Sequence, residues 1–193
     1  MDYSGNASYP LGMRNNNPGD LRDDGTQWQG MTGSNSGFCV FSDSTYGLRA
    51  LALDLTNKMN NDGLTTITEI ITVYAPPSEN DTQSYIDNVS AQTGFEADQT
   101  LTPDAPTIAA LVRAITIQEV GAQYSAMIPD ADIQTALSML PNPLVASLGS
   151  FLTANPELQQ SAGFGVIAVI LVGLFVIWKY RKRIIGGFKT TTL

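Results

Sequence analysis

The stretch MRNNNPGDLR, residues 13–22, places three asparagines, a Pro-Gly pair and two arginines within ten residues. Proline fixes φ at about −65°, glycine accepts positive φ, and asparagine side chains bond their own backbone, so this stretch predicts a rigid turn. A turn does not in itself require Arg14 and Arg22 at its two ends. We therefore expect the turn to carry polar side chains that form part of a binding surface.

The composition excludes several classes of catalytic site. The chain has 193 residues, of which 43% are hydrophobic and 15% charged, so it can bury a core and is long enough for one domain and an additional segment. The single cysteine, Cys39, excludes an internal disulfide framework and a cysteine-based metal cluster. The absence of histidine removes the commonest general base and metal ligand. We expect no cofactor and no metal, and we expect any catalysis to rest on carboxylates.

The net charge of −8 is divided unevenly along the chain. Residues 1–178 contain all 18 acidic residues and only five basic ones, whereas residues 179–193 contain five basic residues and no acid. An acidic body disfavours nucleic acid as its partner.

The run GFGVIAVILVGLFVIW, residues 163–178, is uncharged and mostly apolar. A membrane-spanning helix needs about 20 residues, and snorkelling lysine or arginine side chains can extend a shorter one. Trp178 and Tyr180 lie where an interfacial aromatic belt is expected, directly before a basic cluster. We predict a transmembrane helix at residues 162–180, with a buried core helix as the alternative. Residues 1–12 have no basic or apolar region typical of a signal peptide.

The orientation of this anchor stays open, because two arguments conflict. The positive-inside rule keeps the basic tail, residues 181–193, in the cytoplasm and sends the acidic body across the membrane. Insertion after synthesis, without a signal peptide, would instead leave the body in the cytoplasm. The proposed organisation is an N-terminal extension (1–12), a globular domain (13–140), a proline-containing linker (141–161), the transmembrane helix and the basic tail.

The domain is expected to be mainly α, with about five helices and a small β element. Short aromatic-rich runs around Trp28 and at residues 38–41 are separated by Gly, Ser and Asn and predict a small hairpin or an irregular β piece. Apolar spacings of three and four predict a helix at 44–60 that buries Leu48, Leu51, Leu55 and Met59.

Helix-end signals divide the remainder of the domain. A capping box at Thr66 and Glu69 begins one helix, and a second box at residues 80–83 begins a helix that ends at Gly94. Asp104 caps a further helix that ends at Gly121, and a last helix is expected at 131–140.

Two glutamates are candidate catalytic residues. Glu119 lies in the last turn of an otherwise apolar helix, where the helix dipole and neighbouring isoleucines would raise its pKa, as a glycosidase acid requires. The alternative is an exposed glutamate or one paired with Arg113. Glu79 precedes a helix N-terminus, which favours an ionised carboxylate, or is simply a residue before the cap. The aromatic residues Tyr74, Tyr85, Tyr124 and Trp28 either stack on sugars or belong to the core.

Several motifs occur in a fixed order: RNNNPGDLR, WQG, F-x-V-F-x(4)-YGLRAL, TTITEIITVYAPPSENDTQSYIDNV and AITIQEVGAQYS. Over about residues 13–127 they resemble a family of bacteriophage virion proteins that carry RNNNPGN-[IL]-R, W-x-G, [WY]-x-P-P-x-E-N-x-T and a late E-x-G. Asp20 and Val120 stand where asparagine is expected in this pattern.

The resemblance implies a lysozyme-like helical domain with a small β element, plus one C-terminal transmembrane helix. It implies a virion membrane protein that degrades peptidoglycan as a lytic transglycosylase or muramidase during phage entry. The alternative is a non-catalytic virion protein that links the inner membrane to a capsid or vertex. The expected partners are peptidoglycan, the lipid bilayer and other virion proteins, with the basic tail near DNA or anionic lipid and the host membrane as the location during assembly.

The resulting candidate site combines an acid/base, Glu119, with Glu79 as the residue that binds the glycan or stabilises the transition state. The candidate substrate-binding residues are Arg14, Asn15, Asn17, Trp28, Asn80, Tyr85 and Tyr124. If the turn forms a polar rim beside a cleft, Asn15→Ala and Asn17→Ala should change glycan binding more than stability.

Overall fold

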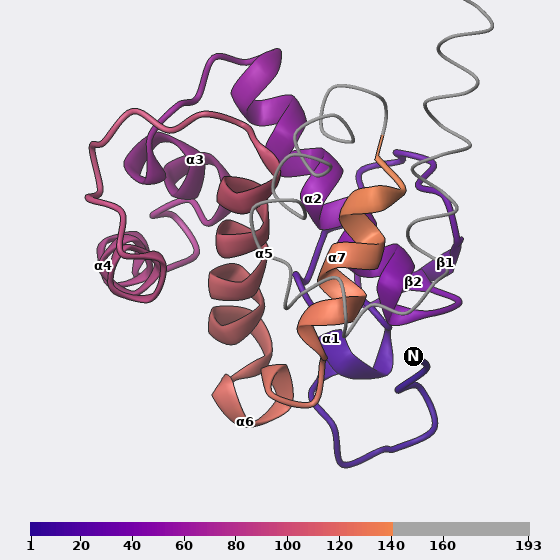
Figure 1. Cartoon of the computed structure of the whole chain (residues 1–193). Helices are drawn as coiled ribbons and strands as arrows, with labels where there is room; N and C mark the ends of the chain where they lie inside the picture. The colour runs from indigo at the N-terminus through magenta and orange to yellow at the C-terminus, as the bar shows by residue number, and fades with distance from the viewer. Residues whose placement is uncertain (141–193) are drawn as a thin grey trace, which may run out of the picture. The chain divides into compact units, whose positions relative to one another are not determined.

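The computed structural model describes residues 1–140 of the chain. The regular secondary structure of this part consists of helices and one small hairpin (Figure 1). The elements are α1 (Leu11–Arg14), β1 (Met31–Asn35), β2 (Phe38–Phe41), α2 (Ser44–Asn60), α3 (Ile67–Tyr74), α4 (Thr82–Thr93), α5 (Ala105–Val120), α6 (Ala122–Ser125) and α7 (Asp130–Ser138). The expected mainly helical class with a small β element is confirmed. Within these residues there are seven helices rather than about five, because α1 and α6 are single turns without apolar periodicity.

The helix α5 occupies the centre of the domain (Figure 1). It contacts α4 on one side and α2 and α7 on another, while α3 packs on α4. Ile108, Leu111 and Ile115 of α5 are fully buried. Leu48, Leu51, Leu55 and Met59 of α2 are buried, as their spacing predicts.

Local capping signals fix most helix ends where the sequence places them. The capping box of Thr66 and Glu69 is present at the start of α3, and the Asp104 carboxylate accepts the Thr107 N–H at the start of α5. The helix α4 ends at Gly94 with φ of 74°. The second predicted box, at residues 80–83, is wrong: the cap of α4 is Asp81, whose carboxylate accepts the Ser84 N–H at 3.1 Å.

The turn at residues 13–22, called the asparagine turn below, is buried at residues 15–19. Asn17 has no exposed surface, and its Nδ2 donates to the backbone carbonyls of Leu21 at 2.9 Å and of Cys39 at 3.0 Å. Its Oδ1 accepts the Leu21 N–H at 3.0 Å. Asn15 is also buried, and its Oδ1 accepts from the Asn35 side chain at 3.0 Å. Both side chains therefore bind other parts of the protein, which corrects the expectation of a polar rim at these two positions.

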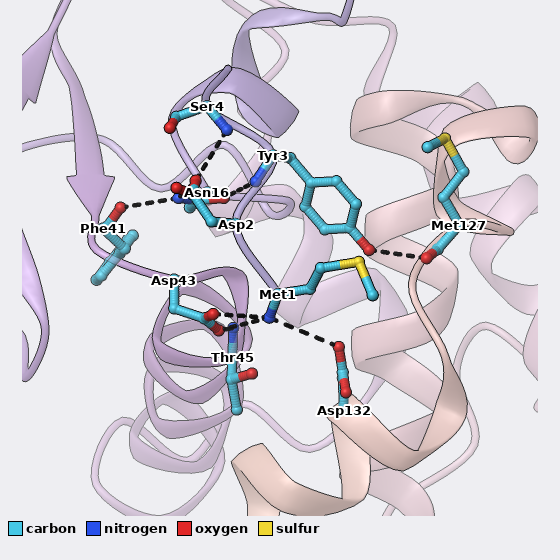
Figure 2. Close-up of polar contacts among 10 residues, drawn as sticks. All are labelled: Met1, Asp2, Tyr3, Ser4, Asn16, Phe41, Asp43, Thr45, Met127 and Asp132. Atoms are coloured by element: carbon cyan, nitrogen blue, oxygen red, sulfur yellow. Dashed lines mark hydrogen bonds and ion pairs between the residues drawn. The ribbon is translucent and has the colours of Figure 1, made fainter. Parts of the chain in front are cut away.

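Asn16 joins the turn to both the N-terminal segment and the hairpin (Figure 2). Its Nδ2 donates to Asp2 at 2.8 Å and to the Phe41 carbonyl at 3.1 Å, and its Oδ1 accepts the Tyr3 N–H at 2.8 Å. The hydrogen bond from Asn16 is the main cause that lowers the pKa of Asp2 to about 2. A Cβ on Gly47 of α2 would lie 2.1 Å from the Asn16 carbonyl oxygen, so this turn and α2 approach as closely as only glycine allows.

The segment described as an N-terminal extension packs against the domain (Figure 2). The N-terminal ammonium of Met1 lies 2.8 Å from the Asp43 carboxylate and 3.9 Å from that of Asp132. The Tyr3 ring is buried, and its hydroxyl donates to the Met127 carbonyl at 2.7 Å. This segment thereby connects the start of α2 with the region around α7.

No helix within residues 1–140 is both long and apolar enough to cross a membrane. The predicted linker, the transmembrane helix at residues 162–180 and the basic tail lie outside the described residues.

We predict that Asn17→Ala lowers the free energy of unfolding by roughly 3 kcal/mol, because it removes three buried hydrogen bonds, two to the Leu21 and Cys39 carbonyls and one from the Leu21 N–H. Unfolding in urea followed by circular dichroism measures the change. Asn57→Ala, on the exposed face of α2, is the control and should shift stability by less than about 0.5 kcal/mol. Unchanged stability in Asn17→Ala together with weakened glycan binding would restore the polar-rim hypothesis.

Candidate functional site

A cleft of about 420 Å³ opens between the asparagine turn, the hairpin, α2, α3 and the C-terminal end of α5. Its lining includes polar and aromatic side chains from each of these segments, among them Asp20, Arg22, Trp28, Tyr74, Asn80 and Glu119. Four of the predicted site residues, Trp28, Glu79, Asn80 and Glu119, therefore line one cleft although they are far apart in sequence.

Glu119 lies partly buried in this cleft, in the last turn of α5. Burial raises its pKa, while a hydrogen bond from Tyr85 and the charge of Arg22 act in the opposite direction. The suggested pairing with Arg113 is wrong. The Arg113 guanidinium instead binds the Ser125 and Ile128 carbonyls and the Asp130 carboxylate, at 2.9, 2.8 and 2.6 Å.

Tyr85 supports Glu119 from α4. The Tyr85 side chain is buried, and its hydroxyl donates to Glu119 Oε1 at 2.6 Å. Burial, followed by the neighbouring Tyr74 and Glu119, raises the pKa of Tyr85, so its hydroxyl stays protonated and available as a donor. The structure thus places this predicted sugar-binding residue beneath the cleft, where it orients a carboxylate.

Asp20 is the site residue that sequence reasoning missed. It lines the cleft from the asparagine turn, and its Oδ1 is buried without a hydrogen-bond partner. Burial and, secondarily, the charge of Glu119 raise the pKa of Asp20 to about 7. The available signal was a carboxylate where the related motif has asparagine, but nothing local in the sequence indicated that this carboxylate would be desolvated.

A second buried hydroxyl holds the turn beside α3. The Tyr74 hydroxyl donates to the Gly19 carbonyl, and burial raises the pKa of Tyr74 well above its ordinary value. This bond fixes the backbone directly before Asp20.

Two ion pairs flank the cleft. Arg22 Nη2 lies 2.5 Å from Glu79 Oε2, and the Arg22 guanidinium also lies over the Phe38 ring, 5.3 Å from its centroid. Lys58 and Asp54 of α2 are 2.6 Å apart. The Arg22–Glu79 pair is exposed, so its contribution to stability is small. Its main effect is on the candidate catalytic residue Glu79, whose carboxylate is held in an ion pair at the rim of the cleft.

The remaining predicted site residues do not line the cleft. Arg14 is exposed, and its Nε donates to the Tyr9 carbonyl at 3.0 Å. Tyr124 packs edge-on against Tyr9, with the ring centroids 5.6 Å apart. Asn15 and Asn17 are buried in the turn.

We predict that Tyr85→Phe raises the pKa of Glu119 further, because it removes the donor that stabilises the ionised carboxylate. Carbon-13 NMR of the labelled side-chain carboxyls as a function of pH measures this shift. Tyr124→Phe, which alters a ring outside the cleft, is the control and should leave the titration of Glu119 unchanged. An equal Glu119 pKa in Tyr85→Phe and in the unmodified protein would show that the Tyr85 hydrogen bond does not stabilise the ionised carboxylate.

Comparison with known proteins places the chain among phage proteins. No protein-family model matches the sequence. The chain is 36% identical over 115 residues to Protein P5 of Pseudoalteromonas phage PM2, and the aligned region covers 57% of this chain and 71% of that protein. At this identity and coverage, the chain belongs to the family of Protein P5 of phage PM2.

Proposed function

We propose that this protein is a membrane-anchored virion protein that cleaves the glycan strands of peptidoglycan during phage entry. The observation that carries the proposal is a cleft lined by two carboxyl groups with raised pKa values, Asp20 and Glu119. Relationship to a phage protein makes a bacterial cell-wall substrate reasonable. The helical domain with its small hairpin is consistent with a lysozyme-like fold.

The lining of the cleft suits a sugar chain. Trp28, Phe38 and Tyr74 provide aromatic surface, and Asn80 and Arg22 provide hydrogen-bond donors. Aromatic rings against which sugars stack, accompanied by a few polar groups, form a typical small-ligand site. Glu79, held by Arg22 at the rim, would contact the glycan rather than act as the acid.

Carboxylates alone can perform this reaction. A glycosidase acid protonates the glycosidic oxygen, and a second carboxylate stabilises the developing positive charge or activates water. A transglycosylase instead returns the proton from the sugar's own 6-hydroxyl, so that it needs no attacking water. Both schemes are compatible with a site that has no histidine.

The predicted anchor gives this activity a location. A transmembrane helix at residues 162–180 would hold the domain beside the bilayer of the virion, and tethering raises the local concentration of enzyme at its substrate. It would also offset the weak adsorption of an acidic domain to an anionic cell wall.

A second candidate function is a non-catalytic link between the inner membrane and a capsid or vertex. The Arg22–Glu79 ion pair favours it, because this pair commits two of the cleft's charged groups to each other. The acidic body would then dock on a basic virion protein, and the basic tail would lie against DNA or anionic lipid.

The test is digestion of purified peptidoglycan by the full chain in a mild detergent, with mass spectrometry of the released muropeptides. We expect cleavage between pH 4 and 8, and anhydro sugar ends would identify a transglycosylase. Glu119→Gln should reduce the rate by roughly 100-fold or more.

Glu96→Gln, which changes an exposed glutamate outside the cleft, is the control and should retain full activity. A folded protein that releases no muropeptides at any of these pH values would favour the linking function.

A further inference from the structure

Two carboxyl groups face the same cleft from different elements. Asp20 belongs to the asparagine turn and Glu119 to the end of α5. The turn holds Asp20 with φ of 47°, a left-handed conformation that aspartate tolerates better than most residues. A Cβ on Gly12 would lie 2.5 Å from Asp20 Oδ1, so this oxygen sits directly over the backbone of α1. The packing of the turn against α1 therefore buries Asp20 Oδ1.

The surroundings of these two carboxyl groups differ. Glu119 Oε1 accepts a hydrogen bond from Tyr85, and the positive charge of Arg22 also favours its ionised form. Asp20 Oδ1 is buried and has no donor. The Tyr74 hydroxyl, which lies in the same cleft lining, donates to the carbonyl of Gly19, the residue before Asp20.

No unpaired cation near Asp20 compensates for this burial among the described residues that line the cleft. Lys58 is paired with Asp54, and Arg22 with Glu79. Three other titratable groups line the cleft or contact one of the two carboxyls, namely Asp24, Tyr74 and Tyr85. The Glu119 carboxyl also acts on Asp20. Of these groups, the Glu119 carboxylate is the one whose charge raises the pKa of Asp20, and the two tyrosines stay neutral because their pKa values are raised.

We propose that Asp20, rather than Glu119, carries the proton of this site and that Glu119 faces it as the ionised carboxylate. On the proposed function, on which this assignment of roles rests, Asp20 is then the acid and Glu119 the residue that stabilises positive charge. Burial and the Glu119 charge raise the pKa of Asp20 to about 7, and burial raises the pKa of Glu119 as well, but at Glu119 the Tyr85 hydrogen bond and the Arg22 charge act against the rise. Environments that push the pKa values of two carboxyls apart divide acid and base roles between them.

The proton balance of the reaction follows. The Asp20 O–H proton moves to the glycosidic oxygen, and the bond from that oxygen to the anomeric carbon breaks with its electron pair on the oxygen. The Glu119 carboxylate stabilises the positive charge left on the sugar. Attack by water or by the sugar's 6-hydroxyl closes the product, and the attacking group's proton returns to Asp20.

The experiment is a pH titration of carbon-13-labelled carboxyl groups by NMR, using the full chain in detergent micelles, with Asp20→Asn and Glu119→Gln alongside. We expect Asp20 to titrate near pH 7, above Glu119. The two substitutions should then have unequal effects on the pKa of the carboxyl group that remains. Glu119→Gln should lower the pKa of Asp20, because the facing anion is removed. Asp20→Asn should leave that of Glu119 nearly unchanged, because Asp20 is already neutral when Glu119 titrates.

The reverse asymmetry, or a Glu119 pKa above that of Asp20, would overturn the assignment. If Asp20→Asn does not fold, the titration of Asp20 in Glu119→Gln decides alone. Digestion of peptidoglycan is measured separately, and we expect the activity to fall as pH rises through about 7. If the protein shows the expected titrations but cleaves no glycan, the assignment of the proton to Asp20 stands and the proposed function is wrong.

Discussion

The hydrogen bonds that Asn16 and Asn17 make to the backbone of β2 are the constraint on which the rest of the structure depends. Their side-chain amides donate to the Phe41 and Cys39 carbonyls and so attach the turn to the hairpin. Buried amides with all their partners present hold a single geometry, and a missing partner carries a large penalty. This attachment fixes the backbone at Gly19 and Asp20, which brings a desolvated carboxyl to the cleft.

Chemistry in the cleft follows from that placement. Asp20 comes from the turn, Glu119 from the central helix α5, and Tyr85 from α4, which packs on α5. The two carboxyl groups line the same cleft because three separate pieces of the chain are packed together, and they differ because only Glu119 accepts a hydrogen bond. An arrangement of this kind can separate an acid from an anion without histidine or metal.

Features with local causes were predictable from the sequence, and features with distant causes were not. The caps at Thr66 and Asp104 depend on residues within one helical turn, and the buried face of α2 depends on periodicity alone. Glu119 was found because its helix is apolar around it. The asparagines were assigned to the surface because their partners, in β2 and residues 2 and 3, are distant in sequence. Asp20 was missed for the same reason, since its burial arises from tertiary packing.

The most direct test of the account is whether a glycan occupies this cleft. Amide and side-chain NMR shifts of the full chain in detergent, recorded as a soluble muropeptide is added, would locate the contact. We predict that the signals of the Trp28 indole and the Asn80 amide shift with ligand concentration, while those of Tyr124 do not. Shifts confined to the hollow between α5 and α6 around Arg113 and Pro129, or no shifts at any concentration, would contradict it.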